Sequence, residues 1–318
     1  MRKKLFAFLI IAIIAVFAAG CGSGETDKAA DQDRDKAKET ETIKITHQLG
    51  ETVVKKNPEK IVVFDFGILD SLDKLGIEVT ALPQASVPEY LSKYKDGSKY
   101  KNVGSLKEPD FEKIAEIEPD LIIISTRQME LFDEFKKLGP TIFMGVDVTN
   151  YMESFKDNMK KLGQIFGKED EMEKELKSIE DRVAALKKRA EESDGKALVI
   201  LANEGNISAY GPGSRFGLIH DEFGLTPADE KIEASTHGQN VSPEYIADVN
   251  PDFLFVIDRG AVVGGQASAE QIVETTLVKN TNAYKNDKII YLDANYWYLS
   301  GGGLISVSEM ISQVEKAL

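Results

Sequence analysis

Short hydrophobic runs alternate with helix-like patterns over most of the chain. Continuous apolar runs are typical of strands buried on both faces, and apolar residues at every third or fourth position are typical of helices. Buried strands are predicted at 61–64, 121–125, 141–144, 197–201, 253–257 and 289–292. Helices are predicted at 69–75, 129–138 and 304–318. The alternation predicts an α/β fold with largely parallel sheets.

The segment 151–193 interrupts this alternation. Its second part, 169–192, contains no glycine or proline and keeps apolar residues at helical spacing among many charges. A helix of this length spans about 36 Å, at roughly 1.5 Å per residue. We expect one long helix that joins two α/β halves. The alternative is a helix that pairs with a partner chain in a coiled coil.

An internal repeat supports two similar halves. Residues 112–124 and 244–256 match as a helix, a Pro-Asp corner and a buried strand, and a weaker match relates 60–64 to 196–200. The sequence therefore predicts two pseudo-symmetric lobes, at 43–150 and 194–318, joined by the helical segment 151–193. A cleft between lobes is a preferred place for a ligand.

The N-terminus has the pattern of an export signal. Three basic residues precede an apolar run, 5–19, that is short for a membrane span. The small residues 18–20 lead to Cys21, which is the chain's single cysteine. We expect a signal peptide at 1–20, lipidation of Cys21 and a flexible charged tether over 21–42. The alternative is an ordinary secretory signal that happens to contain a cysteine.

The chain is acidic, with a formal net charge of −14 that becomes −17 when the three bases of the signal are removed. This charge argues against nucleic acid as a partner. It also makes any cluster of positive side chains notable, because the background field opposes an anion.

Three arginines occupy positions that suggest such a cluster. Arg127 and Arg259 each follow a repeated strand, and the carboxyl ends of strands are where open α/β sheets bind ligands. Arg215 lies in a glycine-containing loop, 210–217. Guanidinium groups bind oxyanions with a planar fork and also stack on aromatic rings. The alternative for each arginine alone is a surface salt bridge.

Aromatic residues and histidines add to this set. Trp297 and Tyr298 precede three glycines, a pattern that favours a pocket rim over a core strand. His237 lies in a polar loop, and the chain has too few histidines for a naked transition-metal site. No Walker loop, G-x-S-x-G or H-E-x-x-H motif occurs, so we expect a binding protein and not an enzyme.

The sequence resembles the iron-siderophore-binding lipoproteins of ABC importers, the class with a rigid helical hinge, over essentially the whole mature chain. It is most similar to the petrobactin-binding lipoproteins of bacilli. The likeness lies in the lipobox-like Cys21 and the repeated Pro-Asp strands, and in four motifs at 103–110, 211–220, 234–239 and 297–303.

This resemblance implies a function and a site. The function is capture of a ferric siderophore, either a catecholate or a mixed catecholate-citrate complex, and its delivery to a membrane permease. The arginine triad of that group matches Arg127, Arg215 and Arg259, with Lys107 as an addition. A histidine and a tyrosine that complete the iron coordination of tetradentate siderophores match His237 and Tyr298.

The resemblance also implies a monomer that is lipid-anchored on the outer face of the membrane, as in a Gram-positive-like cell, with no intrinsic cofactor. Glu112 and Glu244, related by the repeat, correspond to glutamates that dock the permease. The alternative for both is stabilisation of a helix N-terminus. Two other functions stay open: binding of haem, cobalamin or a ferric hydroxamate on the same scaffold, and a surface enzyme or adhesin.

Overall fold

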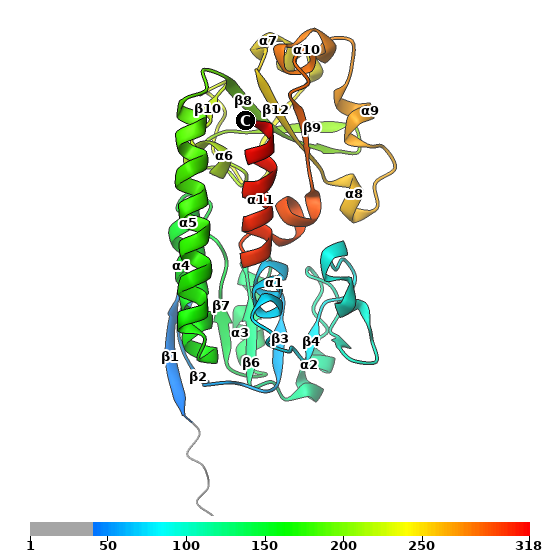
Figure 1. Ribbon diagram of the computed structural model, residues 1–318. Helices are drawn as coiled ribbons and strands as arrows, with labels where there is room; N and C mark the ends of the chain where they lie inside the picture. The colour runs from blue at the N-terminus through cyan, green and yellow to red at the C-terminus, as the bar shows by residue number, and fades with distance from the viewer. Residues whose placement is uncertain (1–40) are drawn as a thin grey trace, which may run out of the picture. The chain divides into compact units, whose positions relative to one another are not determined.

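The computed structural model describes residues 41–318, and their helices and strands follow the predicted alternation (Figure 1). Signal peptide, Cys21 and most of the tether lie outside these residues. Within residues 41–318 no helix is both long and apolar enough to span a bilayer. The chain forms two α/β lobes and a pair of helices that joins them.

The N-lobe is built on a five-stranded sheet whose strands are all parallel, in the order β5-β4-β3-β6-β7. Its strands are β3 (Ile61–Val63), β4 (Ala81–Leu82), β5 (Lys101–Asn102), β6 (Leu121–Ile124) and β7 (Thr141–Phe143). Its helices are α1 (Phe66–Lys74), α2 (Phe111–Ile117), α3 (Phe132–Lys136) and the 3₁₀ helices η1 (Glu89–Lys95) and η2 (Thr126–Leu131). The helix predicted at 129–138 is thus divided between η2 and α3.

An antiparallel hairpin precedes this sheet and was not predicted. It consists of β1 (Thr42–His47) and β2 (Gly50–Lys55). His47 is buried in it, and its Nδ1 accepts a hydrogen bond from the Leu49 backbone. Its Nε2 therefore donates to the Thr52 hydroxyl, which donates to the Thr141 carbonyl at the start of β7. His47 is a structural residue that ties the hairpin to the sheet.

The C-lobe has a mixed sheet in the order β11-β9-β8-β12-β13, with β10 added beside β8. Its strands are β8 (Lys196–Asn203), β9 (Asn206–Tyr210), β10 (Thr226–Pro227), β11 (Gln239–Val241), β12 (Phe253–Asp258) and β13 (Ile289–Leu292). The pairs β8–β12 and β12–β13 are parallel, as expected, whereas β9 is antiparallel to β8 and to β11. The C-lobe helices are α6 (Leu218–Asp221), α7 (Pro243–Val249), α8 (Gly260–Val263), α9 (Ala269–Val273), η3 (Val278–Asn280), α10 (Asn282–Lys285), the π-helix η4 (Asn295–Ser300) and α11 (Leu304–Ala317).

The two copies of the internal repeat have equivalent structures. Helices α2 and α7 have the same length and both end in a left-handed residue, Glu118 and Asn250. The next aspartates, Asp120 and Asp252, each accept a hydrogen bond from the backbone N–H of the lysine that opens a strand segment of the same lobe. Those lysines belong to the weaker sequence match, so the two matches are parts of one repeated unit.

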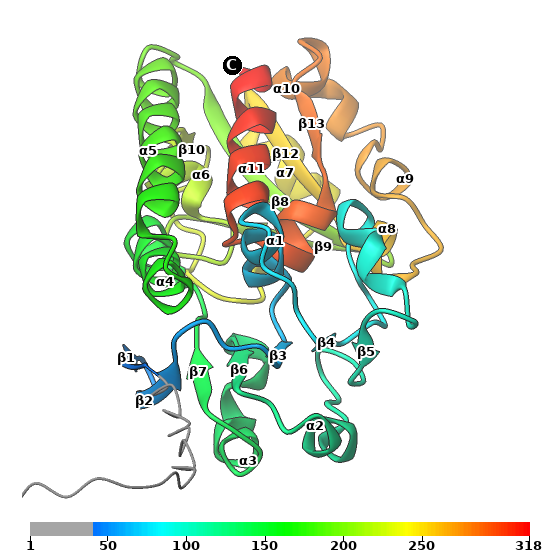
Figure 2. The same cartoon turned by 60° about the horizontal axis from the view of Figure 1, so that its bottom comes forward.

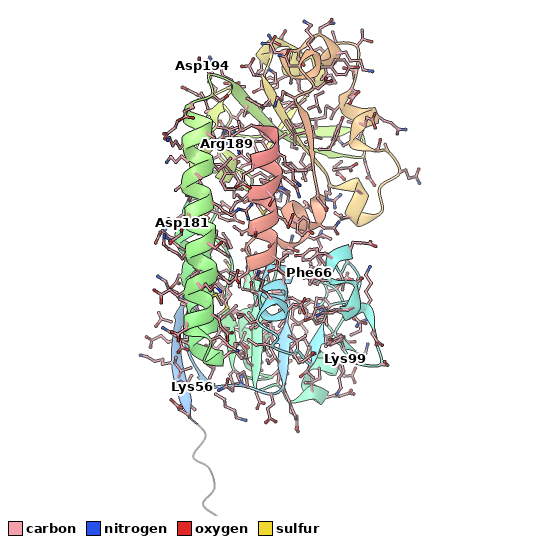
Figure 3. The ribbon with its side chains drawn as sticks, in the orientation of Figure 1. Lys56, Phe66, Lys99, Asp181, Arg189 and Asp194 are labelled. Atoms are coloured by element: carbon pink, nitrogen blue, oxygen red, sulfur yellow. The ribbon has the colours of Figure 1, made fainter. Side chains whose placement is uncertain are left out.

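The segment between the lobes forms two helices, α4 (Tyr151–Phe166) and α5 (Glu169–Glu191), which turn at Gly167. Figures 1 and 2 show both helices side by side along one side of the two lobes. The apolar face of α5 packs in the same core as α4 and α11, so its own chain covers it. Figure 3 shows Arg189 between α5 and α11, with Asp181 on the outer side of α5. The coiled-coil alternative is therefore not needed to explain the pattern.

The lobes also meet directly, where α1 of the N-lobe lies against the start of α11. The buried Asp70 carboxylate accepts hydrogen bonds from the backbone N–H groups of Ile305 and Ser306, at 3.2 and 3.0 Å. A Cβ atom at Gly303 would come within 2.1 Å of Asp70 Oδ1. Gly303 therefore allows close approach of the two lobes, which is a packing role and not the rim role that its sequence context suggested.

Candidate functional site

The three predicted arginines converge on one residue. The Nη2 atoms of Arg127 and Arg215 donate to the backbone carbonyl of Tyr298, at 3.0 and 2.9 Å. The Nε of Arg259 donates to the Tyr298 hydroxyl at 2.8 Å. Arg127 comes from the N-lobe and the other two come from the C-lobe, so the cluster lies where the lobes face each other.

Regular structure places the guanidiniums of Arg127 and Arg259, and a loop places that of Arg215. Arg127 lies in η2, directly after β6, and Arg259 is the N-cap of α8, directly after β12. Both therefore stand at the carboxyl ends of repeated strands, as predicted. Arg215 lies in a tight loop that Asp221 holds by accepting a hydrogen bond from the Gly213 backbone at 2.7 Å.

Tyr298 is presented by the π-helix η4. The Gly301 N–H donates to the carbonyl of residue 296, which makes the wide turn that defines a π-helix. Gly301 and Gly302 then take positive φ angles and end the helix. π-helical turns are frequent at functional sites, and here the turn leaves the Tyr298 carbonyl to the two arginines.

None of the three guanidiniums forms a salt bridge with an acid among residues 41–318. Asp65 is an acid near the cluster: burial raises the pKa of its carboxyl, and the charge of Arg127 opposes that shift. The ion pairs among residues 41–318 include one arginine, Arg182, which pairs with Glu315 far from the cluster in sequence. Burial lowers the pKa of Arg215, and the nearby charge of Arg127 lowers it further. Like charges held close together are costly, and groups with perturbed pKa values are common at binding sites.

The arginines also change the acidity of the Tyr298 phenol. The guanidiniums of Arg215 and Arg259 lie over its ring, with centroid distances of 4.4 and 5.6 Å. Burial by itself raises the pKa of the Tyr298 phenol, but the Arg259 hydrogen bond and the charges of all three arginines outweigh burial and lower it. The lowered pKa makes loss of the phenol proton easier than in an ordinary tyrosine, and a phenolate is a strong ligand for Fe(III).

One neutral contact at this site had no sequence signal. Asn203 Oδ1 accepts a hydrogen bond from Arg259 Nη1 at 2.5 Å. Asn203 lies outside the matched parts of the repeat and belongs to no motif. The strand register alone brings it beside Arg259, since Asp258 pairs with Ala202 in the preceding position.

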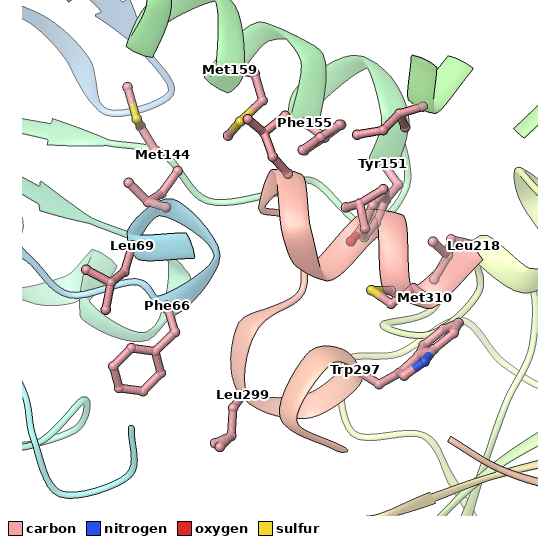
Figure 4. Packing of buried hydrophobic residues seen from close by; sticks show 14 of the residues in the cluster. Phe66, Leu69, Met144, Tyr151, Phe155, Met159, Leu218, Trp297, Leu299 and Met310 are labelled. Atoms are coloured by element: carbon pink, nitrogen blue, oxygen red, sulfur yellow. The ribbon is translucent and has the colours of Figure 1, made fainter. Parts of the chain in front are cut away.

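The predicted rim position of Trp297 is wrong. Its side chain is only 3% exposed and packs in the main core, and its Nε1 donates to Gln313 of α11. Figure 4 shows the indole beside Met310, among the buried hydrophobic residues of this core. Because successive residues of η4 point in different directions, Trp297 faces the core while Tyr298 faces the arginines.

Lys107 and His237 lie on exposed loops beside the cluster. The Lys107 loop is fastened to η2 by a hydrogen bond from Gln128 Nε2 to the Leu106 carbonyl, at 2.6 Å. The His237 carbonyl accepts from the Tyr210 hydroxyl at 3.0 Å. The Arg215 backbone N–H donates to residue 235 in the same loop as His237. Both side chains are exposed to solvent, and their roles toward a ligand stay predictions.

Glu112 and Glu244 are exposed at equivalent positions, the second residue of α2 and of α7. Neither forms one of the salt bridges found among residues 41–318. Their equivalence follows from the repeat, and their docking role stays a prediction.

A separate cavity of about 640 Å³ lies between α4 and α5. Charged side chains of both signs surround it, among them Lys156, Lys160, Glu169 and Glu173. None of the three arginines lines it. We assign the candidate site to the arginine cluster, because the cluster combines three positive charges, an aromatic ring and the interface between the lobes.

A protein with two α/β lobes joined by a long helix, and with a positive site where the lobes meet, belongs to a class of solute-binding proteins. The chain belongs to the periplasmic binding protein family, whose pattern matches residues 61–296. It is 55% identical to the petrobactin-binding protein YclQ of Bacillus subtilis (strain 168), over 99% of each chain. The crystal structure of YclQ superimposes with a TM-score of 0.85, at 57% identity, covering 87% of this chain and 98% of that one.

Two further relatives bind other ligands. The ferric-anguibactin-binding protein FatB of Vibrio anguillarum (strain ATCC 68554 / 775) is 32% identical over 98% of this chain and 96% of its own. The siderophore-binding protein BauB, solved with two molecules of acinetobactin and ferric iron, has a TM-score of 0.81 at 32% identity, covering 87% of this chain and 98% of its own. The resemblance inferred from the sequence is confirmed at the level of the family.

Proposed function

We propose that the protein is the extracytoplasmic binding component of an ABC importer and captures a ferric siderophore with anionic catecholate groups. The observation that carries this proposal is the cluster of three guanidiniums, none of which forms a salt bridge among residues 41–318. A ferric complex of three catecholates, or of two catecholates and a citrate, is an anion of about −3. Three guanidiniums offer the matching charge and many N–H donors, and charged hydrogen bonds of this kind are strong.

The relatives support the ligand class. YclQ is named for petrobactin, and it matches this chain over nearly its whole length. We therefore propose ferric petrobactin, or a simpler ferric catecholate, as the ligand. Petrobactin-like complexes have catechol rings, which offer flat faces to the Arg215 and Tyr298 groups in the cluster.

We also propose how the protein is anchored and how it delivers its ligand to the permease. Cys21 anchors the protein by lipidation on the outer face of the membrane, and Glu112 and Glu244 dock the monomeric protein on its permease. The protein acts by binding and release without catalysis. The charged segment before residue 42 gives the anchored protein reach.

A fluorescence titration tests the ligand. Ferric petrobactin, a ferric tris-catecholate, a ferric hydroxamate and haem are added separately to the purified protein, and quenching of Trp297 is followed. Ferric catecholates should bind most tightly. Arg127→Ala, Arg215→Ala and Arg259→Ala should each weaken binding about tenfold or more, since a hydrogen bond to a charged group contributes roughly 1.5–3 kcal/mol.

Arg189→Ala is the matched control, because Arg189 contacts α11 through the Glu315 carbonyl and not the cluster. It should leave the affinity unchanged. Equal binding of a neutral ferric hydroxamate by wild type and by the three cluster variants would instead favour a hydroxamate-binding function.

A further inference from the structure

The hydrogen-bond acceptors that residues 41–318 provide for the three guanidiniums are uncharged groups. The acceptors are the Tyr298 carbonyl, the Tyr298 hydroxyl and the side-chain amide of Asn203. Most buried or half-buried arginines in proteins pair with a carboxylate, which both orients the guanidinium and cancels its charge. Among residues 41–318 the three guanidiniums are instead oriented without a salt bridge.

Asn203 is the one of these acceptors that has an acidic counterpart of the same size, aspartate. It stands at the end of β8, where a two-residue turn with positive φ at Glu204 and Gly205 leads into β9. The Arg259 N–H donates to the Ala202 carbonyl at 3.1 Å, so the backbones of the two segments are locked together beside the side-chain contact. An aspartate here would have the same size and would meet Arg259 at the same distance.

Asp258, the acid next to Arg259 in sequence, binds backbone N–H groups instead of the guanidinium. Both carboxylate oxygens of Asp258 accept backbone hydrogen bonds, from Ala261 at 3.1 Å and from Ala269 at 2.8 Å. They stabilise the segment that follows β12. Asp258 therefore shapes the chain around Arg259 without forming an ion pair with it among the described residues.

We infer that Asn203 sets the charge specificity of the site: its neutral amide orients Arg259 and leaves the positive charge of that guanidinium to a multiply anionic ligand. Asn203 is thus a positioning residue that acts through Arg259. This inference rests on the proposed function, since it concerns the charge of the ligand that the same site takes.

Two variants separate charge from structure. Asn203→Asp keeps the size and the acceptor but adds one negative charge next to Arg259, whereas Asn203→Ala removes the acceptor and adds no charge. We expect Asn203→Asp to bind a ferric tris-catecholate at least tenfold more weakly, with a shallower dependence of affinity on salt. Asn203→Ala loses only the orientation of Arg259, so it should weaken binding less than Asn203→Asp does, and it should keep the wild-type salt dependence because its cluster has the same charge.

A measurement without ligand makes the test independent of the ligand's identity. Titration of the Tyr298 phenol, taken as the ultraviolet difference between each protein and its Tyr298→Phe counterpart, reports the charge of the cluster. Asn203→Asp should raise the phenol pKa above its value in wild type and in Asn203→Ala.

Equal weakening by both variants with unchanged salt dependence, or an Asn203→Asp phenol that titrates like wild type, would overturn the inference. Failure of the wild-type protein to bind any ferric catecholate would refute the proposed function, and the phenol titration would still decide the role of Asn203.

Discussion

At the scale of single residues, Tyr298 is the residue that all three arginines of the cluster contact. Its carbonyl receives one arginine from each lobe, and its hydroxyl receives a third arginine. A tetradentate siderophore leaves two iron positions open, and the Tyr298 phenolate together with His237 would fill them. A hexadentate complex leaves none.

Tyr298→Phe keeps the backbone carbonyl and the aromatic ring but loses the oxygen. We expect it to remove a phenolate-to-iron charge-transfer band with a tetradentate ferric catecholate, and to weaken that complex about tenfold. A hexadentate complex should lose much less. Visible spectra and titrations of both complexes check this, and a wild-type tetradentate complex without the band would contradict the iron-binding role.

Asp70 is a second residue with a measurable signature. Burial raises the pKa of its carboxyl to about 7, although hydrogen bonds from Ser306, Tyr90 and Ile305 oppose the shift. The folded protein therefore holds this proton more tightly than the unfolded chain, whose pKa is near 3.8. The free energy of unfolding should fall as the pH rises from about 4 to 7, by roughly 4 kcal/mol from this group, and then level off.

Asp70→Asn cannot ionise, so it should remove this part of the pH dependence. Urea denaturation of wild type and variant at several pH values between 4 and 8 compares the two slopes. Parallel stability profiles for the two proteins would show that Asp70 has an ordinary pKa in the folded state.

The residue scale also shows where sequence reasoning succeeds and fails. Arg127 and Arg259 were found because the repeat marks the ends of equivalent strands. Trp297 was misplaced because its neighbouring glycines looked like a pocket rim, whereas at least Gly303 serves lobe packing. Asn203 and the Tyr298 carbonyl could not be found, since strand register and a wide helical turn bring them to the arginines without a sequence motif.

At the scale of elements, the side chain of Arg182 makes several of the polar contacts that hold α5 against α11. Arg182 donates to Ser308 and Ser312 and forms an ion pair with Glu315 at 2.8 Å. Arg182→Ala should lower the free energy of unfolding by about 2 kcal/mol, because a charged network is lost in a half-buried place. Ligand affinity should hardly change.

Lys177→Ala is the control on the same helix. Lys177 pairs with Asp181 on the exposed side of α5, and such pairs contribute little. Chemical denaturation of both variants makes the comparison, and equal stability losses would remove the special role of Arg182.

Elements differed in how well the sequence predicted them. The strands of the repeat were clear, because their continuous apolar runs reflect burial on both faces. The β1–β2 hairpin and β11 were missed, because their exposed, polar positions resemble loops. The antiparallel β9 was also missed, although most of it is buried. The turn between β8 and β9 uses Glu204 at positive φ, which is rare for glutamate and gives no warning in the sequence.

At the scale of the whole molecule, the repeat gives the protein one exposed glutamate per lobe for the proposed docking. Reversal of both, Glu112→Arg with Glu244→Arg, should abolish uptake of the ferric siderophore by cells while leaving its affinity in solution intact. The physical reason is repulsion between the new charges and arginines expected on the permease.

The repeat also provides a matched control for this experiment. Glu116 and Asp248 are equivalent exposed acids on the last turns of the same two helices. Glu116→Arg with Asp248→Arg makes the same charge change and should leave uptake near normal. Normal uptake by the Glu112 and Glu244 double variant would refute docking, and lost ligand binding would place these residues in the site.

The shared acceptor at Tyr298 has a kinetic consequence. A guanidinium carries five N–H donors, and the contacts in the cluster take one from Arg127, one from Arg215 and two from Arg259. An arriving anion can therefore bind donors that these contacts leave unused, without first breaking the bonds that hold the arginines. Capture then does not require these contacts to break, and we expect its rate to be set by encounter and by the local field of the cluster.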